Sequence, residues 1–139
     1  MKPILLDTST IVASLDRSER FHKACVDSIA EIAGPLVTCE AVIAECCYLL
    51  RNLQGATDAV LQNVEARVFQ IPLSLQDMAG PVRRILRKYD DSDIELADAC
   101  LIHLAGELNT GEILTLDSDF EHYRWGRKSR FKLLVNRHA

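Results

Sequence analysis

The chain has 139 residues, of which 48% are hydrophobic and 26% are charged, and its net charge at pH 7 is −4. This length suits one compact domain and is too short for two ordinary ones, and the composition excludes a disordered or fibrous protein. No apolar run approaches the roughly 18 to 20 residues that span a bilayer, and the first residues do not form a secretory signal. We therefore expect one cytoplasmic domain over residues 1–139.

Short apolar runs alternate with helical patterns in the first half of the chain. Thr8-Ser9-Thr10 supplies helix N-cap residues directly after the first apolar run, and Gly34-Pro35 stops the next helix. The elements predicted from these patterns are a strand at 3–7, a helix through 11–15, a helix at 19–33, a strand at 36–38, and a helical hairpin from 39–53 and 56–68.

The second half of the chain continues this alternation. Pro72 favours an edge or terminal position for the next strand, and Gly80-Pro81 delays the regular part of the following helix until Pro81. The predicted elements are a strand at 68–73, a helix at 76–89, a polar break at 90–93, a clearly amphipathic helix at 94–108, and strands at 113–116 and 131–135. Strands and helices that alternate in this way predict an α/β fold, in which helices cover both faces of a mainly parallel sheet.

Four acidic residues stand where a carboxylate is locally out of place. Asp7 and Asp117 each end an apolar, strand-like run, while Glu45 and Asp98 lie on apolar faces of predicted helices. Burying such carboxylates singly would cost several kcal/mol each, so they would tend to take up protons instead. A shared divalent cation removes this cost, and the carboxyl ends of parallel strands are where ligands bind in such folds. The pattern therefore predicts one metal site.

Each acid also has a purely structural interpretation. Asp7 could cap the first helix, Asp117 could cap a turn through residues 118–119, and Glu45 or Asp98 could pair with a basic residue. Taken singly, these structural roles are favoured. Taken together, four coincidences on apolar faces and strand ends are less plausible than one site.

Carboxylate oxygens in this number suit Mg²⁺ or Mn²⁺, and such ions assist phosphodiester hydrolysis. We assign Asp7, Glu45 and Asp98 as metal ligands, directly or through water, and Asp117 completes the set of catalytic acids. Ser9, Thr115 and Asp119 are candidates to orient these ligands, with Asp119 an alternative to Asp117 if the strand continues. The acids that we instead assign to solvated loop and helix-start positions are Asp90, Asp91, Asp93 and Glu95.

Basic residues gather toward the end of the chain. Residues 121–139 hold six Lys or Arg against one Glu, although the chain as a whole is acidic. A basic strip beside an acidic site suits a phosphodiester substrate, and it is equally typical of a solvated surface. The candidate phosphate contacts are Arg51, Arg84, Arg87, Lys88 and Arg124.

The ordered set of acidic motifs resembles the PIN-domain ribonucleases, and the tail is similar to that of the VapC-type toxins of toxin–antitoxin pairs. The segments that carry this resemblance are Ile4-Leu5-Leu6-Asp7-Thr8-Ser9, Val42-Ile43-Ala44-Glu45, Leu96-Ala97-Asp98-Ala99, residues 114–120, Tyr123-Arg124 and Phe131-Lys132-Leu133-Leu134. It implies a three-layer α/β/α fold and a Mg²⁺- or Mn²⁺-dependent endonuclease that cuts single-stranded or loop RNA. It also implies a homodimer that a small antitoxin protein inhibits. Family members vary in which acid of Asp117-Ser118-Asp119 contributes most.

Two other functions remain open at this point. One is a PIN-type nuclease that acts in RNA maturation or on DNA without an antitoxin. The other is a non-catalytic acidic metal-binding module, such as a receiver-like domain, although the lysine after a late strand and the acidic pair after the first strand are lacking.

Overall fold

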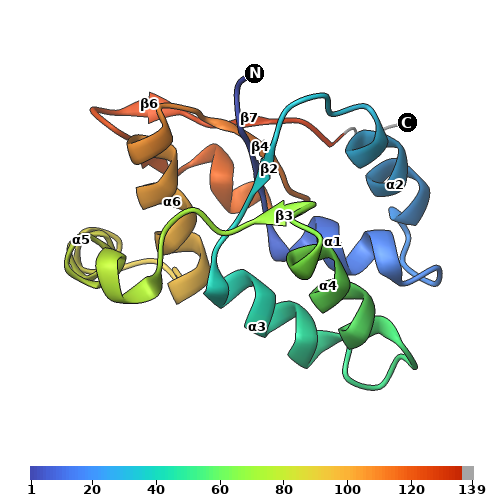
Figure 1. Ribbon diagram of the computed structural model, residues 1–139. Coiled ribbons are helices and arrows are strands. Elements are labelled where there is room, and N and C mark those ends of the chain that lie inside the picture. The colour runs from blue at the N-terminus through green and yellow to red at the C-terminus, as the bar shows by residue number, and fades with distance from the viewer. Residues whose placement is uncertain (136–139) are drawn as a thin grey trace.

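A five-stranded parallel sheet forms the centre of the molecule (Figure 1). The structure is a computed structural model that describes residues 1–135. The strands follow the order β3-β2-β1-β4-β7, and all four neighbouring pairs are parallel, as predicted. Their bounds are β1 (Ile4–Leu6), β2 (Leu36–Val37), β3 (Phe69–Gln70), β4 (Glu112–Leu114) and β7 (Lys132–Leu133).

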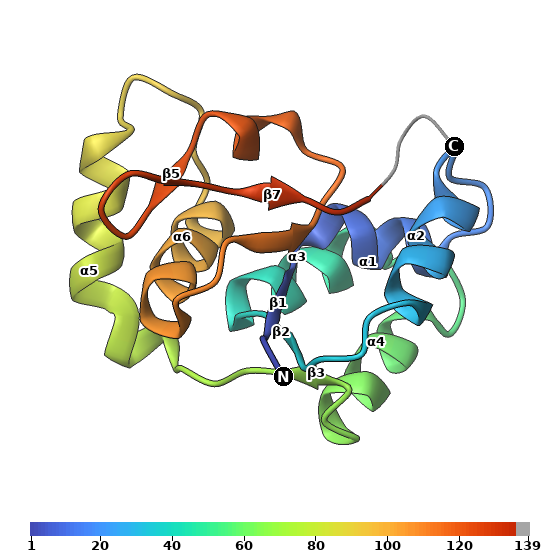
Figure 2. The same cartoon turned by 90° about the horizontal axis from the view of Figure 1, so that it is seen from above.

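Helices cover both faces of this sheet, which confirms the three-layer α/β/α fold. Figure 2 shows α5 and α6 on one side of the sheet and α1, α2 and α4 on the other. Helix α3 starts where β2 ends, lies beyond the carboxyl ends of the strands and contacts α1, α4 and α6 (Figure 1). The helices are α1 (Thr8–Leu15), α2 (His22–Ala30), α3 (Glu40–Leu49), α4 (Ala56–Glu65), α5 (Leu75–Lys88) and α6 (Leu96–Leu108).

The sheet and α6 form the centre of the hydrophobic core. All three residues of β1 are buried, which explains why this strand reads as a continuous apolar run rather than an alternating one. Helix α6 was expected to be amphipathic, yet every residue from Ala97 to Ile102 is buried. It is enclosed by its neighbours on most sides. Within the described residues, no helix is long and apolar enough to cross a membrane.

Helix α5 is longer than the sequence analysis predicts. It runs continuously from Leu75, with Pro81 inside it, rather than becoming regular only at Pro81. Pro81 removes one intrahelical hydrogen bond, but Ser74 caps the helix by accepting a bond from the Asp77 backbone N–H at 3.1 Å. Met78 and Val82 are buried on the face toward α6, so tertiary packing also supports the segment on both sides of the proline.

The chain after β4 differs most from the prediction. The strand ends at Leu114, and a short 3₁₀ helix, η1 (Ser118–Glu121), replaces the expected strand continuation. An antiparallel hairpin follows, formed by β5 (Arg124–Trp125) and β6 (Ser129–Arg130), and the sequence analysis missed it. Each of its strands has only two residues, too few to show a strand period. Strand β3, by contrast, lies at the sheet edge as predicted.

Candidate active site

The site lies where the chain reverses its direction of travel across the sheet. From β1 the chain proceeds to β2 and β3 on one side and later returns to β4 on the other, so the crevice opens between the carboxyl ends of β1 and β4. Asp7 directly follows β1, and its backbone N–H donates to the carbonyl of Leu114 at 3.1 Å. Asp117 follows β4 after two intervening residues.

The carboxylate of Asp7 is buried, with 4% exposed, and hydroxyl groups hold it in place. Its Oδ2 accepts a hydrogen bond from Thr115 Oγ1 at 2.6 Å and a longer one from Ser9 Oγ at 3.4 Å. The same two hydroxyls accept from the backbone after β4: Leu116 N–H donates to Ser9 Oγ at 2.9 Å, and Asp117 N–H donates to Thr115 Oγ1 at 3.0 Å. Although Asp7 stands at the N-cap of α1, its side chain makes no capping hydrogen bond.

The other two acids come from helices that meet at this edge. Asp98 lies in the first turn of α6, where its Oδ2 accepts from the Glu95 backbone N–H at 3.3 Å and from the Tyr123 hydroxyl at 3.4 Å. Glu45 projects from α3 and is half-buried. Three ion pairs occur among residues 1–135, and none involves Glu45 or Asp98, so the structural alternative of a basic partner does not hold there.

All four acids line one hollow of about 360 Å³, which we call the acidic hollow. Asp7, Glu45, Asp98 and Asp117, from four separate segments, are thus brought together, as the sequence analysis expects. The other residues that line it are Thr8, Ser9, Leu49, Asp93, Glu95 and Asp119. The carboxylates share the hollow without closing on a common point: no group of three or more His, Cys, Asp or Glu side chains in the described chain stands in a geometry that could hold a metal ion. Coordination would therefore require them to move closer than they lie here.

Burial and the charges of neighbouring acids favour the protonated forms of Asp7 and Asp98. The pKa of Asp7 is raised to about 6, chiefly by burial and in smaller part by the negative charges of Asp117 and Glu45, while hydrogen bonds from Thr115 and the Thr8 backbone act to lower it. Burial also raises the pKa of Asp98 to about 7, with the charge of Asp7 adding to the effect. Such carboxylates are costly to ionise together, and a bound cation would relieve that cost.

Glu95 and Asp93 also line the hollow, although the sequence analysis assigned them to solvated surface. The pKa of Glu95 is raised, chiefly by a hydrogen bond with the carboxyl group of Glu45. The spacing offered a signal for Glu95, because residues three apart on a helix share a face and Glu95 precedes Asp98 by three. We find no comparable signal for Asp93.

Asp119 reaches the hollow by a different route from the one expected. It lies on η1 rather than on an extended strand, and its backbone N–H donates to Asp117 Oδ1 at 2.9 Å. The structural interpretation of Asp117 as a turn cap is therefore correct, and its carboxylate lines the hollow as well. One carboxylate can serve both purposes because it has two oxygens.

The donor set fits a hard divalent cation. The polar groups around the hollow are carboxylates and hydroxyls, which are the oxygen ligands that Mg²⁺ and Mn²⁺ prefer. The hydroxyl of Thr8 is buried there and has no hydrogen-bond partner among the described residues. A buried hydroxyl without a partner is costly, so a bound ion with its water would satisfy a group that the protein leaves unpaired.

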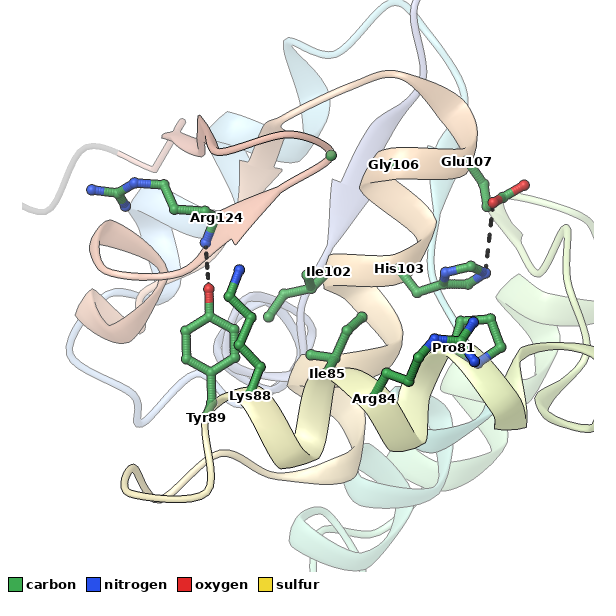
Figure 3. Close-up of a pocket in the computed structure, with 11 residues that line it drawn as sticks. Pro81, Arg84, Ile85, Lys88, Tyr89, Ile102, His103, Gly106, Glu107 and Arg124 are labelled. Atoms are coloured by element: carbon green, nitrogen blue, oxygen red, sulfur yellow. Dashed lines mark hydrogen bonds and ion pairs between the residues drawn. The ribbon is translucent and has the colours of Figure 1, made fainter.

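Three of the five candidate phosphate contacts line one hollow, and the other two lie elsewhere. Arg84, Lys88 and Arg124 line a second hollow, of about 310 Å³, between α5, α6 and the β5–β6 hairpin (Figure 3). Arg87 is exposed on α5 and does not line it. Arg51 lies over the Tyr48 ring, with its guanidinium carbon 4.0 Å from the ring centre, and donates to the Tyr48 carbonyl at 2.7 Å.

Comparison with known proteins agrees with this geometry. The family model of the PIN domain matches residues 4–126. The chain belongs to the PIN-domain family. A relative of this PIN-domain protein, Ribonuclease VapC26 of Mycobacterium tuberculosis, is 34% identical over 116 residues, covering 82% of this chain and 86% of its own. The resemblance to VapC-type PIN proteins is thus confirmed.

A solved structure shares the fold. It is the crystal structure of Mycobacterium tuberculosis VapC20, described as a toxin that cleaves the sarcin-ricin loop. It superposes with a TM-score of 0.77 at 19% sequence identity, covering 86% of this chain and 93% of VapC20. At this identity the match supports the three-layer fold.

Proposed function

We propose that this PIN-domain protein is a metal-dependent endoribonuclease of the VapC type that hydrolyses phosphodiester bonds in single-stranded or loop RNA. The observation that carries the proposal is the convergence of Asp7, Glu45, Asp98 and Asp117 in one hollow at the carboxyl edge of the sheet. A relative named as a ribonuclease and a fold neighbour described as cleaving an RNA loop support the choice of substrate.

The proposed cofactor is Mg²⁺ or Mn²⁺, with Asp7, Glu45, Asp98 and Asp117 as ligands, directly or through water. Bound in the acidic hollow, such an ion would lower the pKa of a water molecule and offset the charge of the phosphodiester. The protein's own part is to hold the ligands ready. Thr115 and Ser9 fix the carboxylate of Asp7, while the Glu95 backbone N–H and the Tyr123 hydroxyl fix that of Asp98.

We also propose a small antitoxin protein as partner and a homodimer as the assembly. Tyr48, Leu49 and Leu53 are large apolar side chains that remain exposed at the end of α3 and just after it, and Leu49 also lines the acidic hollow. Exposed apolar side chains beside a site give a protein inhibitor a surface on which to cover it.

The test is cleavage of a labelled single-stranded RNA with Mg²⁺ or Mn²⁺. We expect cleavage by the unaltered protein and its loss in Asp7→Asn and Asp98→Asn, with both variants still folded. Asp90→Asn is the matched control, because Asp90 is exposed and does not line the hollow. Cleavage that persists in both site variants would disprove the proposed site. Metal binding without cleavage of any RNA would favour the non-catalytic module.

A further inference from the structure

The second hollow, which we call the basic groove, lies along α5 and α6 and carries the opposite charge to the acidic hollow. Arg84, Lys88 and Arg124 line it, and Ile85 of α5 and Ile102 of α6 face each other across its floor (Figure 3). Among the described residues neither Arg84 nor Lys88 has an ion-pair partner. The acid in the groove, Glu107, lies 3.9 Å from His103 of the same helix at the far end. The excess positive charge therefore faces the open groove.

Arg124 is held at the rim where the groove meets Tyr89. Its Nη1 donates to the carbonyls of Glu121 and Tyr123 at 3.0 and 2.9 Å, and its backbone N–H donates to the Tyr89 hydroxyl at 3.0 Å. These contacts fix the position of the hairpin over α5.

Two packed aromatic rings lie between the groove and the acidic hollow. Tyr89 lines the groove and packs edge-on against Tyr123, with ring centres 5.2 Å apart, and the Tyr123 hydroxyl donates to Asp98. A further hollow is lined by Asp93, Asp119 and Tyr123, and two of these residues, Asp93 and Asp119, also line the acidic hollow. The Tyr89 end of the groove is therefore the end linked by contacts to the acids.

We propose that the basic groove binds the sugar–phosphate backbone of RNA on one side of the cleaved bond. This inference rests on the proposed function, because it assigns a path to the same substrate. Arg84 and Lys88 are four residues apart on α5, hence on one helix face, and Arg124 lines the groove from the hairpin, with its guanidinium directed away from α5. Phosphates repeat along a strand, so an elongated row of cations suits them better than it suits a single small anion.

The test measures RNA binding apart from cleavage. A fluorescein-labelled single-stranded RNA is titrated in EDTA with protein carrying Asp7→Asn, and fluorescence anisotropy gives the Kd at several KCl concentrations. The groove variant adds Arg84→Ala and Lys88→Ala. Arg124 stays unaltered because it also supports the hairpin. The control variant instead adds Arg17→Ala and Arg20→Ala, which removes the same net charge from exposed positions between α1 and α2, across the molecule from α5 (Figure 2).

We expect the groove variant to bind RNA on the order of tenfold more weakly at low salt. The slope of log Kd against log salt should fall by about 1.4, since each phosphate contact on a single strand contributes about 0.7. The control variant should stay within about twofold in Kd with an unchanged slope. Unchanged binding in the groove variant, or equal loss in both variants, would overturn the proposal.

Two further outcomes separate this inference from the proposed function. If the unaltered protein cleaves RNA while the groove variant binds RNA as well as its parent, the groove proposal alone fails. If RNA binding weakens as expected but no metal supports cleavage, the groove proposal stands and the proposed function fails. Normal RNA binding in the groove variant with lost binding of poly-glutamate would assign the groove to an acidic protein segment and overturn the proposal.

Discussion

The acidic hollow lies at the first turn of helix α6 and the basic groove lies along its second half, and the two regions differ in how they hold charge. Asp98 in the first turn of α6 is buried and has a raised pKa, whereas Arg84 and Lys88 are exposed on α5. Buried like charges destabilise a fold, while exposed cations cost it little. The hollow therefore retains groups that are unfavourable for stability, which is the pattern of a functional site.

The largest expected effect comes from removing a carboxylate from the acidic hollow. Asp7→Asn should lower the rate of RNA cleavage on the order of 100-fold or more, because it removes the most buried of the four acids. The free energy of unfolding at pH 7.5 should not fall, since Asn keeps an acceptor for Thr115 and loses a buried charge. Cleavage assays and urea unfolding of the same preparation check both. A variant that is inactive because it is unfolded would contradict this account.

The pH dependence of stability should also distinguish the buried acids of the hollow from the exposed cations of the groove. The pKa of Asp7 is raised from 3.8 to about 6, so the folded protein binds this proton more tightly than the unfolded chain does. Its contribution to stability is complete below about pH 4 and is lost as pH rises through 6, and Asp98 extends this window to about 7. Between pH 8 and pH 5, Asp7 should add about 1 to 2 kcal/mol to the unfolding free energy without metal.

Urea unfolding in EDTA at both pH values measures this change. Asp7→Asn should show a rise on acidification that is smaller by about the same 1 to 2 kcal/mol. The groove variant with Arg84→Ala and Lys88→Ala should follow the unaltered protein, because its charges are exposed. Identical pH profiles for Asp7→Asn and the unaltered protein would show that Asp7 does not titrate as inferred.

Metal addition should restore part of the stability that the protein loses when its buried acids ionise at high pH. At pH 8, Mn²⁺ at ten times its Kd should raise the free energy of unfolding by about 1.4 kcal/mol, and EDTA should remove the gain. At pH 5 the gain should shrink, because protons compete for the carboxylates. Thermal unfolding checks this with Asp90→Asn as a control that keeps the gain and Asp7→Asn as a variant that loses most of it. An equal gain in all three proteins would place the ion elsewhere.

The smallest effect concerns the link between the two regions. Tyr123→Phe keeps the ring contacts with Phe120 and Tyr89, both at 5.2 Å between centres, and removes the hydroxyl that donates to Asp98. Because that hydrogen bond is long, cleavage should fall less than about tenfold and the unfolding free energy should change by no more than about 1 kcal/mol. Single-turnover cleavage and urea unfolding measure the two quantities. A loss as large as that of Asp98→Asn would mean that the hydroxyl acts on RNA itself.

The four acids could be found from the sequence because each contradicts its local pattern. Asp7 and Asp117 follow apolar runs, and Glu45 and Asp98 interrupt apolar helix faces, so their convergence follows from strand order and helix phase. Glu95 was assigned to the surface because a helix-start acid is ordinarily favourable there. Only the packing of α3 against α6, which sets Glu45 beside it, reveals the contact.

The basic groove depends on elements whose local signals were weak. One side of the groove is formed by the β5–β6 hairpin, whose two-residue strands are held by cross-strand contacts such as the hydrogen bond from Trp125 Nε1 to the Arg130 carbonyl at 3.0 Å. Gly111 leaves room for the Trp125 ring, since a Cβ there would lie 2.1 Å from Trp125 Nε1. Side-chain contacts of this kind leave no periodic trace in the sequence. The basic residues were visible, but their gathering around one groove was not.

The most direct measurement is anomalous diffraction from crystals grown with Mn²⁺ at pH 8. The account predicts a peak in the acidic hollow, within coordinating distance of the carboxylates of Asp7 and Asp98, after the acids have drawn closer together. It also predicts that this peak disappears in Asp7→Asn crystals. A protein that cleaves RNA while its only Mn²⁺ peak lies outside the hollow would contradict the central claim.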